Sequence, residues 1–185
     1  MAGFKKRSWR LFEPVAPPGT MPDGTAWPAT YTRGYVADGH GTAVYQPEGW
    51  RASEGGELEI ATRMAANGYD VALRKVSEAE GVRTADAYLI RDGVSESWEF
   101  KRTSEGATNI VENIRLHFRD GNKQAPNVVV YIDRDDVSQN DIWRAARGAV
   151  SRDIVNELRQ LGTIDRSGIL RTWSRAEVKD HGEVP

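Results

Sequence analysis

The chain contains no cysteine among its 185 residues. Disulfide bridges, thiolate nucleophiles and cysteine-ligated zinc are therefore excluded. Long hydrophobic runs are absent too, since no apolar stretch approaches the roughly 20 residues that a membrane-spanning helix requires. The basic start over residues 5–10 is followed by prolines rather than by an apolar segment, so we expect no secretory signal peptide.

A strong charge of either sign is also missing, because the formal net charge is −2 although 28% of the residues are charged. Non-specific nucleic-acid binding depends on neutralising phosphates, so this balance argues against a protein that coats nucleic acid. A nucleic-acid role would use a local patch, and an acidic site would need a metal ion to approach a polyanion. Hydrophobic residues make up 39% of the chain, and its length is sufficient for one well-buried domain.

The first part of the chain differs in composition from the remainder. Residues 1–52 are rich in proline and glycine, and their aromatic residues follow neither a helical nor a strand period. We predict an irregular arm or small subdomain whose aromatic side chains pack on the main body rather than stack on bases. The main domain is expected over residues 53–185.

Regular patterns begin at Ser53, and helices alternate with strands from there on. This alternation predicts an α/β fold with a central mixed sheet and helices on both faces. The predicted elements are a helix from a Ser53 cap to a stop at Asn67–Gly68, a strand over 69–75, a hairpin over 86–101, a helix over 106–122, a buried strand over 127–132, a helix from a Ser138–Asp141 capping box through Leu161, and a strand over 169–174.

The hairpin over 86–101 is the most informative segment. Asp92–Gly93 at its centre is a favoured two-residue type I′ turn, because both positions require a positive φ. If this turn sets the register, Asp86 lies opposite Glu99. Directly opposed residues have Cβ atoms roughly 5 Å apart, and like charges in that relation are destabilising. We therefore expect a compensating positive charge beside this pair.

The other face of the hairpin is mostly apolar, so the two acids belong to a regular polar face. Mg²⁺ takes one or two carboxylates, keeps several waters and binds phosphate oxygens, and the pair therefore indicates a site for cutting phosphodiesters. An ordinary solvated polar face, on which Lys101 offsets the acids, is the alternative. The positions predicted to face the core are Ala85, Ala87, Leu89, Val94, Trp98 and Phe100.

These residues resemble the pattern of the PD-(D/E)XK nuclease superfamily, with Ala85 where the proline of that name would stand. More narrowly, they resemble the C-terminal tRNA-cleaving domains of contact-dependent growth-inhibition toxins, over residues 53–174. The motifs that carry the resemblance are Glu57, Thr84-Ala-Asp86-Ala-Tyr-Leu, Trp98-Glu99-Phe-Lys101 and Asn109-Ile-Val-Glu-Asn-Ile before Asn127-Val-Val-Val.

The resemblance implies that Asp86 and Glu99 ligate a divalent metal ion, Mg²⁺ or Mn²⁺, with Zn²⁺ as an alternative. The backbone carbonyl of Phe100 and a water held by Glu57 would complete the set. Lys101 would orient or deprotonate the attacking water, which suits a lysine next to a metal.

Several of these assignments have alternatives. Glu54 and Glu59 compete with Glu57, since a glutamate in a first helical turn also favours the helix dipole. His117 fits neither the apolar stripe of its helix nor a metal-ligand spacing, so we predict a structural role for it. The candidate substrate-binding residues, for which a solvated helix face is the alternative, are Asn109, Asn113 and Arg115.

The function implied by the resemblance is hydrolysis of RNA, with tRNA favoured over DNA, by the toxic part of a bacterial competition system. A cognate immunity protein would be its partner, and it would act in the cytoplasm of a target bacterium after delivery. A DNA endonuclease of the same fold and a non-catalytic module that binds nucleic acid or protein are the alternatives.

Overall fold

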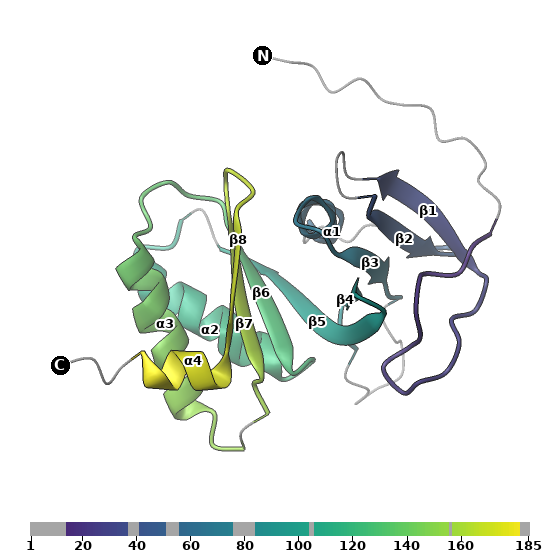
Figure 1. Cartoon of the computed structure of the whole chain (residues 1–185). Coiled ribbons are helices and arrows are strands. Elements are labelled where there is room, and N and C mark those ends of the chain that lie inside the picture. Colours follow the sequence, from purple (N-terminus) through teal and green to yellow (C-terminus); the bar gives the residue numbers. More distant parts are fainter. Residues whose placement is uncertain are drawn as a thin grey trace, which may run out of the picture.

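The computed structural model describes residues 14–36, 41–50, 56–75, 84–103, 106–155 and 157–181. Eight strands form one mixed sheet in which each strand pairs with its neighbour in the chain (Figure 1). The predicted α/β fold with a mixed sheet is confirmed. The strands are β1 (Tyr31–Val36), β2 (Ala43–Pro47), β3 (Asp70–Leu73), β4 (Ala87–Arg91), β5 (Val94–Arg102), β6 (Asn127–Ile132), β7 (Gln160–Asp165) and β8 (Leu170–Ser174).

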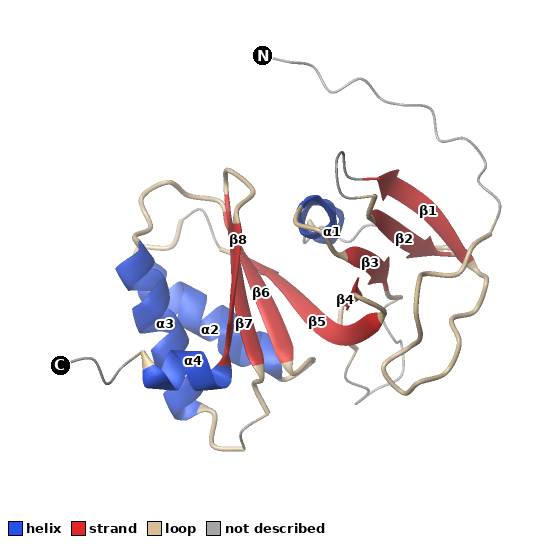
Figure 2. Ribbon diagram, in the orientation of Figure 1, coloured by secondary structure: helices blue, strands red, loops and turns tan. Residues whose placement is uncertain are grey.

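Helices cover both faces of the sheet (Figure 2). The helix α1 (Glu57–Ala66) lies on one face, and α2 (Ile110–Asn122), α3 (Gln139–Arg152) and α4 (Arg175–Asp180) lie on the other. The pairs β2–β3, β5–β6 and β6–β7 are parallel, and one helix connects the strands of each pair. Within the described ranges, no helix combines the length and the apolar content needed to cross a membrane.

Two strands lie in the segment that the sequence assigns to an arm. β1 pairs with β2, and β2 pairs with β3, so this segment extends the main sheet across the expected boundary at residue 52. The aromatic side chains of Trp27, Tyr31 and Tyr45 are buried against Tyr88 of β4, as predicted for arm residues that pack on the body. The rings of Trp27 and Tyr88 meet edge to face at 5.3 Å.

The first helix is one turn shorter at its start than the Ser53 cap predicts. α1 begins after Gly56, and Ser53 lies outside the described residues. The predicted stop is confirmed, because Asn67 is the C-cap and Gly68 has a φ of 88°.

The long helix predicted to run through Leu161 is wrong at its end. α3 has the predicted Ser138–Asp141 capping box but stops at Arg152. Asp153 Oδ2 accepts a hydrogen bond from the Leu158 amide and also pairs with Arg175, which turns the chain toward β7. Of the apolar residues that continue the helical spacing, Leu158 and Leu161 are buried beyond the end of the helix, and Ile154 is exposed.

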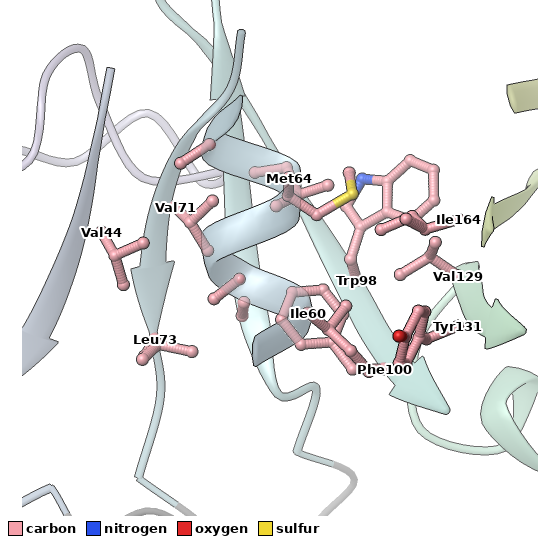
Figure 3. Packing of buried hydrophobic residues seen from close by; sticks show 14 residues of the cluster. Val44, Ile60, Met64, Val71, Leu73, Trp98, Phe100, Val129, Tyr131 and Ile164 are labelled. Atoms are coloured by element: carbon pink, nitrogen blue, oxygen red, sulfur yellow. The ribbon is translucent and has the colours of Figure 1, made fainter. Parts of the chain in front are cut away.

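Side chains of the sheet alternate between the two helical layers. Trp98 and Phe100 of β5 pack against Ile60 and Met64 of α1 (Figure 3). Because successive strand residues point to opposite faces, Glu99 lies on the side of α2.

The β4–β5 hairpin follows the predicted register. Asp92 and Gly93 have φ values of 53° and 78°, and Ala87 pairs with Trp98. The prediction that Val94 faces the core is wrong, because this residue lies at the hairpin tip and is 65% exposed.

Candidate active site

Glu99 is a carboxylate held in the interior. Its side chain is 2% exposed, in the middle of β5 and under α2. Gly121 makes this approach feasible, since a Cβ at that position would lie 3.3 Å from Glu99 Cγ and 2.6 Å from Val128 Cγ1. A glycine on α2 therefore provides the space that the acidic side chain occupies.

Asp86 lies where the chain enters β4. Continuation of the register from the Ala87–Trp98 pair places it opposite Glu99. Its Oδ2 accepts a hydrogen bond of 2.8 Å from the Phe100 amide, which would bond to a backbone carbonyl if β4 continued. The side chain is thus anchored to the strand that carries Glu99.

The pKa values of both acids are raised, chiefly by burial. Burial raises the pKa of Glu99 to about 7, the negative charge of Asp86 adds to this rise, and Lys101 opposes it. Burial is also the main cause of the raised pKa of Asp86; the Phe100 amide lowers this pKa and the charge of Glu57 raises it. Two buried acids in contact resist simultaneous ionisation until a cation joins them.

Lys101 is the cation present at the site. Its Nζ donates a 2.5 Å hydrogen bond to Glu99 Oε1, and its side chain is 23% exposed. The ammonium therefore reaches from solvent to the buried carboxylate, where it can contact both a metal-bound water and a phosphate.

Of the three candidate glutamates, Glu57 has the position that best fits the predicted role. It is the first residue of α1, and its charge acts on the pKa of Asp86. Glu59 forms ion pairs with Arg63 at 3.0 Å and with Arg102 at 3.1 Å. Glu54 lies outside the described residues.

The donor atoms at this site fit a hard divalent cation. Glu99 Oε2 is buried and has no hydrogen-bond partner in the described part of the chain. The N–H and C=O of a strand residue point to the same side, so the Phe100 carbonyl faces Asp86 as its amide does. An all-oxygen set suits Mg²⁺ or Mn²⁺ better than Zn²⁺, which prefers nitrogen and sulfur.

No ready-made cage of three or more His, Cys, Asp and Glu side chains occurs in the described ranges. Two carboxylates and a carbonyl would leave coordination positions to water and to substrate oxygens. Mg²⁺ is commonly held in this way, with one or two carboxylates and several waters.

The three candidate substrate-binding residues occupy different positions on α2. Asn109 is the N-cap, and its side chain accepts a hydrogen bond from the Glu112 amide at 3.1 Å. Arg115 is 9% exposed in its side chain, pairs with Glu112 and packs against Gly148 of α3. Asn113 is half-buried on the same helix. The structure thus gives Asn109 and Arg115 structural partners, and a contact with substrate stays a prediction.

His117 is a site neighbour that the sequence pattern did not reveal. It lies one turn before Gly121 on α2, and its Nε2 is buried. Burial lowers its pKa, and the positive charge of Lys101 lowers it further. Its spacing of four residues from Gly121 indicates that His117 lies on the sheet-facing side of α2. This spacing points to the candidate site only once the structure has placed Glu99 under Gly121.

One solved structure is similar to part of the chain. No family model and no curated protein matches the chain. The chain is similar to the CdiA-CT/CdiI toxin and immunity complex from Burkholderia pseudomallei, with 20% sequence identity and a TM-score of 0.43. The similarity covers 64% of this chain and 81% of that chain.

Proposed function

We propose that the protein is a metal-dependent phosphodiesterase that hydrolyses RNA, with tRNA as its preferred substrate. The observation that supports this most is the convergence of Asp86 and Glu99 from adjacent strands, with the Lys101 ammonium bonded to the second acid. A buried acidic pair with a raised pKa is unfavourable by itself and becomes favourable around a divalent cation.

Each residue has a distinct role in this proposal. Asp86, Glu99 and the Phe100 carbonyl would hold the metal ion, and Glu57 would hold one of its waters. The bound cation would polarise the phosphoryl group and lower the pKa of a bound water. Lys101 orients that water and stabilises the charge that develops on the phosphate oxygens.

The choice of RNA and the toxin role come from the sequence resemblance described above. They include a cognate immunity protein as partner and action in the cytoplasm of a target bacterium. Induced expression in a bacterial host tests this part. Wild type should stop growth and deplete tRNA, and Glu99→Gln should do neither. Normal growth with intact tRNA at equal expression of wild type would argue against a toxin.

The cleavage assay uses purified protein with total RNA and, in parallel, supercoiled plasmid, each with Mg²⁺ or with EDTA. We expect cleaved tRNA only with Mg²⁺, loss of cleavage in Glu99→Gln, and much slower but still measurable cleavage in Lys101→Ala. Glu96→Gln is the matched control, because Glu96 lies on the same strand but is exposed and bonds to Gln160. Plasmid cleavage with intact tRNA would select a DNA endonuclease. Intact RNA and DNA in all lanes would favour a binding module.

A further inference from the structure

One buried nitrogen near the site has no function in the proposed chemistry. His117 Nε2 is shielded from solvent, and no hydrogen-bond partner for it lies within the described residues. A buried polar atom without a partner costs free energy, so its presence beside a candidate active site calls for a physical reason.

The course of α2 places this nitrogen beside Lys101. α2 connects β5 to the parallel strand β6, so it runs antiparallel to β5 while contacting both strands. Gly121 lies over Glu99, His117 is four residues earlier on the helix, and Lys101 is two residues later on the same face of β5. Four helical residues span about 6 Å and two strand residues about 6.6 Å, which puts His117 level with Lys101.

The electrostatics agree with this placement. The charge of Lys101 is, after burial, the second cause that lowers the pKa of His117. A lowered pKa favours the neutral imidazole, in which one ring nitrogen is an acceptor. The neighbouring polar residues Asn109 and Arg115 already have hydrogen-bond partners, whereas His117 Nε2 has none within the described ranges.

We propose that His117 is a positioning residue that receives Lys101 when a divalent cation engages Glu99. In the metal-free structure, Lys101 Nζ donates to Glu99 Oε1. With Glu99 engaged by the cation, Nζ would turn and donate to His117 Nε2. An ammonium has three donors, so this bond fixes Nζ in place and leaves donors for the attacking water and the phosphate. The inference rests on the proposed function, which supplies the cation and the substrate.

The kinetic test compares two substitutions of similar size. His117→Leu removes the acceptor, and we expect kcat for RNA cleavage to fall by about tenfold or more with KM nearly unchanged. His117→Gln retains an acceptor oxygen and should stay within about threefold of wild type. His181→Gln is the control, because His181 stacks on Trp143 away from the site. In a Lys101→Ala background, His117→Leu should have almost no additional effect. Full kcat in His117→Leu, or the same loss in both backgrounds, would overturn the inference.

A spectroscopic test does not depend on activity. Glu99→Ala frees Lys101 without any metal, so the ¹⁵N resonance of His117 Nε2 should move toward that of a hydrogen-bonded acceptor. The shift should disappear in Glu99→Ala/Lys101→Ala. If the resonance is the same with and without Lys101, the inference about His117 is overturned and the proposed function is not affected. If Glu99→Ala shows the lysine-dependent shift but the wild-type protein cleaves neither RNA nor DNA, the proposed function is overturned and the contact is established.

Discussion

Glu99 Oε1 and Lys101 Nζ lie 2.5 Å apart, two residues from each other on the same face of β5. The second oxygen of Glu99 has no hydrogen bond in the described part of the chain. One oxygen of the carboxylate is therefore paired with the ammonium, and the other is buried without a hydrogen bond. This division makes the site sensitive to pH, to metal ions and to small changes in packing.

The free energy of unfolding of the metal-free protein should fall as the pH rises through the pKa range of Glu99. The pKa of Glu99 is 4.5 in its ordinary state and about 7 when folded, so the folded state retains a proton that the unfolded state releases. Between these pH values the loss amounts to roughly 3 kcal/mol at most. Urea unfolding in EDTA at pH 5 and pH 8 measures it. Glu99→Gln should remove most of this difference, and equal pH dependence in both proteins would contradict the expectation.

Divalent cations should stabilise the protein more at high pH than at low pH, because they compete with the proton on Glu99. At a metal concentration about 100 times Kd, the gain is about 2.7 kcal/mol. Thermal unfolding with and without Mn²⁺ at pH 6 and pH 8 measures the effect. Glu99→Gln should lose the response and Glu96→Gln should retain it. A Tm increase that persists in Glu99→Gln would place the ion elsewhere.

Removal of the lysine charge should destabilise the protein only where Glu99 is ionised. In Lys101→Met at pH 8 the buried carboxylate has lost its cation, which costs about 3–5 kcal/mol for a buried pair. At pH 5 the protonated acid needs no counter-ion, so the loss should be small. Urea titrations at both pH values compare this variant with Lys123→Met, whose lysine is exposed. The same loss at pH 5 and pH 8 would refute the electrostatic explanation.

Gly121→Ala tests the packing that holds Glu99 in place. The new Cβ would lie 2.6 Å from Val128 Cγ1 in a fully buried layer, so the helix must shift. Overpacking of this kind costs about 1–3 kcal/mol, and the displaced helix should weaken Mn²⁺ binding. Gly106→Ala is the control, since a Cβ there meets no atom within 4 Å. Chemical denaturation and Mn²⁺ titration measure both effects, and unchanged Mn²⁺ affinity in Gly121→Ala would separate the site from this packing.

The β4–β5 hairpin shows what turn and alternation patterns can predict from the sequence. Asp92–Gly93 requires positive φ at both positions, and this requirement alone determines the register that brings Asp86 opposite Glu99. The failure at Val94 has a simple cause: alternation predicts a face of the sheet, but it does not predict where the covering helix ends.

The end of α3 shows where local rules fail. The spacing of Ile154 and Leu158 continues the helical stripe, yet Ile154 is 89% exposed and Leu158 is buried beyond the end of the helix. Asp153 and Arg175 stop the helix through a contact 22 residues apart in the chain. No pattern within a short window contains that pair.

The sequence by itself determined the alternation of helices and strands, the turn between β4 and β5, and the pairing of two acids across it, because these depend on residues close together in the chain. Only the tertiary structure decided that β1 and β2 join the sheet, that Gly121 covers Glu99, and that the charge of Lys101 acts on His117. The last two relationships arise because α2 crosses back over β5 and β6, and such long-range packing depends on how whole surfaces fit together.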